Sequence, residues 1–321
     1  MRPRSPAGAA LPWFPGALSA VGIGRGLALV GTYAELSKLG VISLVLVSTA
    51  AGFLLGAPLG PDFPWHHGLI AIGGVLLLSS GASALNQVQE RRQDALMART
   101  AGRPLPSGRV SLTHGVCFSA LGIASGAALL WLGLGTTAGV LGVIAAAFYN
   151  GLYTPWLKPS SPFAAVPGAV PGALPPVIGW VAGGGRPWDM SALILFGILF
   201  LWQMPHFWAL AIRYRRDYAA GGFPMVSEAV GVEGTARLIL LYALALTGLS
   251  LAAPTFGLGG VVSLAAAAGL GYLLVRLAAR FVRQPHDQRG WLSLFLFSNL
   301  YLLILLAVMV AERLARYVLD T

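Results

Sequence analysis

The chain has 321 residues, of which 56% are hydrophobic and only 10% charged, and its formal net charge is +10. Soluble globular proteins carry about 25% charged residues, so this composition excludes a protein whose whole surface faces water. The apolar runs are continuous and roughly twenty residues long, as in transmembrane helices, whereas strands of a membrane barrel alternate in hydrophobicity. Basic residues in such a chain set orientation or attract anionic lipid and phosphate, and we expect no nucleic-acid partner.

Residues 1–32 precede the first apolar run and are rich in Pro, Gly and Ala. The basic start, with Arg2 and Arg4, is compatible with a signal peptide. Arg25 interrupts the stretch that follows, and no clear cleavage pattern comes after it. We therefore predict a mobile N-terminal tail over residues 1–32, an amphipathic segment near residues 33–38, and a single transmembrane domain over residues 33–321.

Nine apolar segments are candidates for membrane spans, which predicts an all-α integral membrane protein. They cover residues 39–59, 67–87, 114–134, 138–156, 163–184, 191–212, 235–253, 258–278 and 291–311. The fifth segment is interrupted by Pro167, Pro171, Pro175 and Pro176. Prolines are tolerated in membrane helices where neighbours satisfy the freed backbone groups, and here they indicate kinks beside a cavity.

Lysine and arginine are distributed unequally between the two ends of these segments. With nine spans, eighteen of the 21 basic residues lie in the N-terminal tail or in loops on the same side. The three on the other side are Arg186, Arg313 and Arg316. The positive-inside rule then places the N-terminus and the long polar loops 88–113 and 213–234 in the cytoplasm, with the C-terminus outside.

Three oxygen-bearing side chains follow one another where the second segment meets its polar loop. Asn86, Glu90 and Asp94 are spaced four residues apart, so on a helix they share one face. Mg²⁺ prefers oxygen ligands and often uses one or two carboxylates plus substrate phosphate, and the arginines that follow could hold diphosphate oxygens bidentately. The alternative is a solvated helix end in which both acids pair with neighbouring arginines.

Two further groups lie in or beside the spans. His206 follows Pro205 inside the sixth segment, and intramembrane ionisable residues are functional candidates by default. It could ligate a haem iron or donate a hydrogen bond; alternatively, it is a neutral imidazole bonded to carbonyls that Pro205 frees. Asp217, near the cytoplasmic end of that segment, could complete a cation site with Asn86, Glu90 and Asp94. Lys158, at the end of the fourth segment, is either a phosphate-binding charge or an interfacial anchor.

The motif Asn86-xxx-Glu90-xxx-Asp94-xx-Met97-x-Arg99-Thr100-xx-Arg103-Pro104-Leu105 resembles the first acidic motif of the intramembrane aromatic prenyltransferases. Within that superfamily, Trp202-Gln203-Met204-Pro205-His206-Phe207, with Asp217-Tyr218 and Gly222-Phe223-Pro224-Met225, resembles the branch that farnesylates haem. The resemblance covers about residues 33–310. Glu90 stands where the superfamily usually has Asp, and Arg92 where it has a further acid.

The resemblance implies nine transmembrane helices around a central cavity that opens toward a cytoplasmic Mg²⁺–diphosphate site. It implies transfer of a farnesyl group from farnesyl diphosphate to haem B in a bacterial-type cytoplasmic membrane, with Asn86, Glu90, Asp94 and Asp217 organising Mg²⁺. Arg99, Arg103 and Lys158 would hold diphosphate, and His206 would position haem. A haem A synthase or a terminal oxidase assembly would receive the product.

Two other functions stay open from the residues themselves. A quinone precursor or another tetrapyrrole could accept the prenyl group, although His206 and its aromatic surroundings argue against this. A transporter with a basic cytoplasmic mouth is the non-enzyme alternative, for which we would expect inverted repeats. The polar loops show no internal symmetry of that kind.

Overall fold

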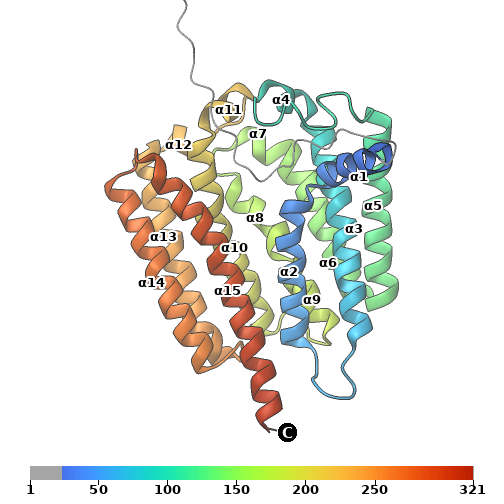
Figure 1. The fold of residues 1–321 in the computed structure, drawn as a ribbon, viewed down its shortest axis with the longest axis vertical. Coiled ribbons are helices and arrows are strands. Elements are labelled where there is room, and N and C mark those ends of the chain that lie inside the picture. Colours follow the sequence, from blue (N-terminus) through green and yellow to red (C-terminus); the bar gives the residue numbers. More distant parts are fainter. Residues whose placement is uncertain (1–23, 321) are drawn as a thin grey trace, which may run out of the picture.

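The structure is a computed structural model that describes residues 24–320, and every regular element in this range is a helix (Figure 1). Nine helical segments of the described chain are long and apolar enough to cross a membrane. The predicted all-α fold with nine spans is thereby confirmed, and the protein is an integral, multi-pass membrane protein.

The spans follow the predicted segments with shifts of a few residues at their ends. Six consist of one helix or one helix with a short extension: α2 (Leu39–Gly56), α3 (Trp65–Gln89), α5 (Leu112–Leu134), α10 (Met190–Arg213), α13 (Gly231–Ala252) with the 3₁₀ turn η2 (Ala253–Phe256), and α14 (Val261–Arg283). The fourth joins α6 (Thr136–Ala147), the π-helix η1 (Phe148–Leu157) and α7 (Lys158–Ser160). The fifth is broken into α8 (Ala165–Ala173) and α9 (Pro175–Ala182), as its prolines predicted.

The last span, α15, runs from Gln288 to Asp320 and is longer than predicted. Glu312 and Arg313 do not end the helix, because their side chains form hydrogen bonds with the ends of two other helices. Glu312 accepts hydrogen bonds from the backbone N–H groups of Gly260 (2.8 Å) and Ser263 (2.8 Å), at the start of α14. Arg313 donates to the carbonyl oxygens of Leu54 (3.1 Å) and Ala57 (2.7 Å), at the end of α2.

The nine spans pack in sequence order into a ring, which α15 closes by contacting α2. Part of the interior is filled by a close crossing of α2 over α9. Neither Gly52 of α2 nor Gly179 of α9 has room for a Cβ atom, because it would collide with the carbonyl oxygens of Pro176 and Thr49, respectively. Glycine is thus required at this contact by the approach of two backbones.

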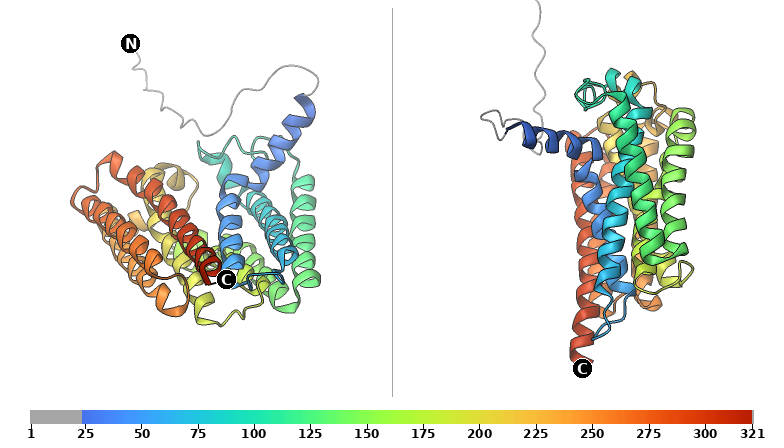
Figure 2. Two further views of the ribbon diagram at one scale, coloured as in Figure 1. Left: turned by 60° about the horizontal axis from the view of Figure 1, so that its bottom comes forward. Right: turned by 90° about the vertical axis from the view of Figure 1, so that its right-hand side faces the viewer.

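The helix α1 (Gly24–Ser37) lies across one end of the bundle, roughly perpendicular to the spans (Figure 2). Gln87 Nε2 donates to its Leu36 carbonyl (2.8 Å), and Arg109 Nη2 pairs with its Glu35 carboxylate (2.7 Å). The tail predicted over residues 1–32 overlaps this helix from Gly24 onward. Residues 1–23 lie outside the described range, and their mobility stays a prediction.

Candidate active site

The short helices α4 (Arg91–Leu96), α7, α11 (Arg215–Ala220) and α12 (Val226–Ala229) all lie at the end of the bundle that α1 crosses (Figure 1). The acidic motif belongs to this end. Asn86 is in the last turn of α3, Glu90 joins α3 to α4, and Asp94 is in α4. These side chains are buried, with residue exposures of 2%, 4% and 0%. The alternative of a solvated helix end is therefore wrong for all three.

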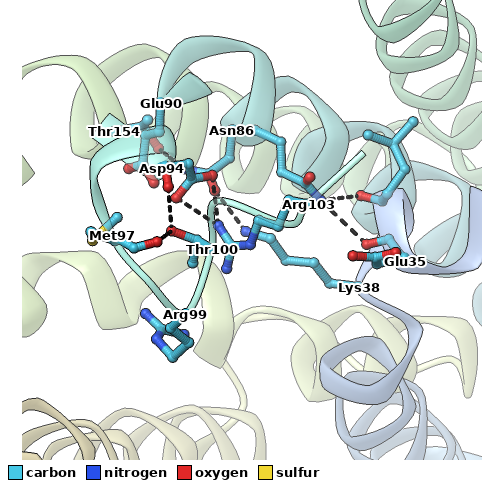
Figure 3. A network of polar contacts seen from close by, with 12 residues as sticks. Glu35, Lys38, Asn86, Glu90, Asp94, Met97, Arg99, Thr100, Arg103 and Thr154 are labelled. Atoms are coloured by element: carbon cyan, nitrogen blue, oxygen red, sulfur yellow. Dashed lines mark hydrogen bonds and ion pairs between the residues drawn. The ribbon is translucent and has the colours of Figure 1, made fainter. Parts of the chain in front are cut away.

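Each of the three residues has a basic partner, and Figure 3 shows those of Asn86 and Asp94. Lys38 Nζ donates to Asn86 Oδ1 at 2.7 Å, and Lys158 Nζ pairs with Glu90 Oε1 at 2.5 Å. Arg103 Nη1 contacts both carboxylate oxygens of Asp94, at 2.9 and 2.7 Å. The only two lysines of the sequence thus meet the same motif from residues 38 and 158. Both acids thus pair with basic residues, as the alternative interpretation expected. The contacts are buried, however, and two of the three basic residues are distant from the motif in sequence.

The π-helix η1 determines where Lys158 and two further polar groups lie. Asn86 Nδ2 donates to Thr154 Oγ1 (3.2 Å), and Gln89 Nε2 donates to the Asn150 carbonyl (2.7 Å). Pro155 lies inside this helix and lacks the N–H that a regular α-helix would use. π-Helical turns are uncommon and frequently occur at functional sites. Here the wide turn fixes the side-chain amide of Asn86, so that its Oδ1 atom faces Lys38.

Lys38 is the only non-glycine residue with a positive φ in the described range (φ 56°). This left-handed conformation costs energy in a residue that carries a Cβ, and it separates α1 from α2 and directs the lysine to Asn86. Burial, and next the charge of Arg103, lower the pKa of Lys38 to about 7, although Glu90 and Asp94 act in the opposite direction. Burial is thus the main reason that the charged form of Lys38 is disfavoured.

Arg99 and Asp217 lie beside this network without joining it. The Arg99 guanidinium lies over the rings of Tyr214 (4.9 Å) and Tyr218 (5.6 Å), and Nη2 is 3.4 Å from the Tyr218 hydroxyl. Asp217 is in α11, which packs against α4. Within residues 24–320, no three His, Cys, Asp or Glu side chains are grouped closely enough to hold a metal. The structure thus brings Asn86, Glu90, Asp94, Arg103 and Lys158 together. Arg99, in the turn after α4, and Asp217, in α11, lie beside them.

His206 belongs to a separate cluster between α10 and α15. Its Nδ1 atom is 3.1 Å from the Ser298 hydroxyl, and its ring is stacked between Trp202 (4.8 Å) and Phe295 (4.6 Å). The predicted alternative, a bond to carbonyls freed by Pro205, is not what the structure shows. About 10 Å of helix separates His206 from the end of α10 at Arg213.

Three residues of these sites were missed from the sequence. The sequence offered one indication that Lys38 is a site residue, since it is one of only two lysines in a strongly basic chain. Thr154 lies four residues before Lys158, at the end of the fourth predicted segment, but nothing there indicated a bond to Asn86. Ser298 had no signal at all, because a serine in an apolar span usually bonds its own helix backbone.

The comparisons agree with the fold and with the predicted family. Residues 45–300 match the model of the UbiA prenyltransferase family. A protoheme IX farnesyltransferase of Bdellovibrio bacteriovorus is 38% identical over 281 residues, covering 88% of this chain and 96% of the relative. Another of that name, from Synechococcus sp. (strain JA-3-3Ab), is 39% identical over 284 residues, covering 88% and 84%.

Solved structures share the fold at low sequence identity. A digeranylgeranylglyceryl phosphate synthase superimposes with a TM-score of 0.73 at 19% identity, covering 88% of this chain and 98% of that one. A UbiA homologue from Archaeoglobus fulgidus bound to GPP and Mg²⁺ gives 0.60 at 14% identity, covering 87% and 99%. The family model, the relatives and the shared fold lead to one conclusion: this chain is a prenyltransferase and belongs to the UbiA prenyltransferase family.

Proposed function

We propose that the protein transfers the farnesyl group of farnesyl diphosphate to a vinyl group of haem B, with addition of water, to give haem O and diphosphate. The acceptor and donor follow from relatives named protoheme IX farnesyltransferase, which match 88% of the chain. The observation that supports the chemistry is the buried row of Asn86, Glu90 and Asp94, each paired with a cation.

The donor set of this row fits Mg²⁺. It offers an amide oxygen and two carboxylates, and Mg²⁺ prefers such hard oxygen ligands together with substrate phosphate. Asp217, whose carboxylate has no hydrogen bond or ion pair among the described residues, is the fourth ligand that we propose. Bound there, Mg²⁺ would neutralise charge that develops on the diphosphate as it leaves.

The basic residues would change partners when substrate binds. In the free protein Lys158 and Arg103 neutralise Glu90 and Asp94, and Lys38 donates to the Asn86 amide oxygen. The same three basic side chains suit the oxygens of a diphosphate. Arg99, held against two tyrosines, adds a fourth positive charge. Diphosphate would therefore bind where positive groups are already assembled, and it would separate from the allylic carbon in a strongly stabilising field.

The reaction then balances as follows. The C–O bond to diphosphate breaks with its electron pair on the leaving oxygen, and the haem vinyl group forms a C–C bond to the allylic cation. Water adds to the cation left on the haem side chain, and its second proton leaves to solvent. The stacked Tyr149 and Tyr153 rings of η1 (5.9 Å) offer π-faces near this charge, and His206 would hold the porphyrin.

We place the active site on the cytoplasmic side of a bacterial-type cytoplasmic membrane, since eighteen of the 21 basic residues belong to that end or to the preceding tail. A haem A synthase or a terminal oxidase assembly is the recipient that we propose. A quinone precursor as acceptor is the second candidate, and the assay that follows separates the two.

The test is incubation of the purified protein with haem B, farnesyl diphosphate and Mg²⁺, followed by mass analysis of haem and of any added quinone. The wild type should convert haem, and Glu90→Gln and Asp94→Asn should each lose about 100-fold or more in rate. Asp62→Asn, an exposed acid in the loop before α3, is the matched control and should stay active. Unmodified haem beside a prenylated quinone would refute the proposed acceptor, and full activity of both site variants would refute the metal site.

A further inference from the structure

The His206 cluster carries an inference about Ser298, a residue of α15 with 0% exposure. It rests on the proposed role of haem as substrate. We propose that Ser298 is a positioning residue that fixes the tautomer of His206, with the proton on Nδ1 and the lone pair of Nε2 directed to the haem iron.

The argument begins with the single proton of the Ser298 hydroxyl. Ser298 Oγ lies 2.8 Å from the carbonyl oxygen of Phe295 and 3.1 Å from His206 Nδ1. A carbonyl oxygen cannot donate, so the shorter contact is attractive only if the hydroxyl proton points at Phe295. The hydroxyl then has only lone pairs left for the imidazole, and Nδ1 must carry the proton that joins them.

The opposite assignment is unfavourable. If the hydroxyl donated to Nδ1, two oxygens would face each other 2.8 Å apart with no proton between them. The Phe295 carbonyl also accepts from Asn299 Nδ2 at 2.9 Å, and it has no proton to offer in either case. The two contacts of Ser298 are satisfied together only by the Nδ1–H tautomer.

The second ring nitrogen is left available. Nε2 has no hydrogen-bond partner among the described residues, and it is not one of the polar atoms that are sealed from solvent without a partner. In this tautomer Nε2 has the lone pair that a ferrous or ferric iron requires. Metal-ligating histidines commonly donate their other N–H to an oxygen, which fixes the ring and increases its basicity.

The orientation of the ring is fixed from the same residue. Trp202 Nε1 donates to the Ser298 carbonyl at 2.6 Å, and the Trp202 ring stacks on the imidazole. The ring of Phe295, one turn before Ser298, also stacks on the imidazole, at 4.6 Å. Ser298 therefore joins α10 to α15 by two hydrogen bonds.

The tautomer can be tested in the haem-free wild type by ¹⁵N NMR of labelled histidine, with His206 assigned from the signal that His206→Ala loses. We expect a protonated Nδ1 and an unprotonated Nε2. The reverse pattern would overturn the inference, whether or not any serine variant folds.

The haem contact can be tested by titrating ferrous haem B into the protein without farnesyl diphosphate and recording the iron–histidine stretch by resonance Raman. His206→Ala should lose the band. Ser298→Ala should move it to lower wavenumber and raise the haem dissociation constant about tenfold, and Ser298→Thr should restore both. Ser293→Ala, an exposed serine of the same helix, should match wild type.

Failure of the inference and failure of the proposed function give different results. An unchanged band and affinity in Ser298→Ala, in a protein that still farnesylates haem, would overturn the role of Ser298 alone. An iron–histidine band that survives His206→Ala would also overturn it, because another residue would then hold the iron. A Ser298-dependent band without any farnesylated product would support the inference and refute the proposed reaction.

Discussion

Replacing Lys158 by Met should change the affinities for Mg²⁺ and for diphosphate in opposite directions. In the free protein Lys158 Nζ lies 2.5 Å from Glu90 Oε1, and the side chains are 21% and 5% exposed. A metal that uses Glu90 must displace this partner. A hydrogen bond to a charged group contributes about 1.5–3 kcal/mol, so its loss should tighten Mg²⁺ binding without diphosphate about tenfold to a hundredfold.

Diphosphate should respond the other way, because Lys158 is one of the cations that we assign to it. In the presence of Mg²⁺, Lys158→Met should bind a non-reactive farnesyl diphosphate analogue more weakly by at least tenfold, since one charge-assisted contact of similar size is lost. Isothermal titration of Mg²⁺ alone, and then of the analogue at saturating Mg²⁺, measures the two effects separately.

Two controls define the result. Lys158→Arg keeps the charge and should retain both affinities within a few-fold, while Arg186→Met removes a basic residue outside the spans, in the loop between α9 and α10, and should alter neither. Mg²⁺ affinity that is unchanged or weaker in Lys158→Met would refute the idea that lysine and metal compete for Glu90.

Three further predictions concern contacts that support the site or the fold. Thr154→Val removes the acceptor of Asn86 Nδ2 (3.2 Å) and should weaken Mg²⁺-dependent diphosphate binding about fivefold, for a bond of about 1 kcal/mol; Thr154→Ser should retain it, and equal losses in both would contradict the assignment. Glu312→Gln weakens the bonds to the Gly260 and Ser263 N–H groups and should lower the unfolding free energy by about 1–3 kcal/mol, seen as a lower thermal midpoint that Glu228→Gln does not share. Gly179→Ala places a methyl group against the Thr49 carbonyl and should reduce the yield of folded protein, whereas Gly248→Ala, with open space around it, should be tolerated; normal folding of Gly179→Ala would show that the α2–α9 crossing can move apart.

Much of the fold could be predicted because hydropathy reports directly on burial in lipid. The nine spans and the break at Pro175 follow from residue type alone. The length of α15 could not be predicted, since Glu312 and Arg313 look like the polar end of a helix. Their role depends on which helix ends lie beside them, and this is known only from the packed structure.

The candidate site, too, could be predicted only in part from the sequence. The shared face of Asn86, Glu90 and Asp94 follows from helical spacing, and the structure places all three in one buried row. Their partners could not be derived, because Lys38 and Lys158 are distant in sequence and reach the row only through a left-handed residue and a π-helix. Ser298 could not be identified from the sequence for a similar reason, since its contact with His206 depends on how α15 packs against α10.

The ion pairs of the acidic row also bear on how the protein is made. A new chain enters the membrane before it meets metal or substrate, and a buried carboxylate without a partner would oppose that step. Lys158 and Arg103 act as built-in counter-ions to Glu90 and Asp94 during this period, so both carboxylates are paired within the chain itself. Stripping divalent metal with a chelator should accordingly stop turnover while the helices stay assembled, and added Mg²⁺ should restore activity without refolding.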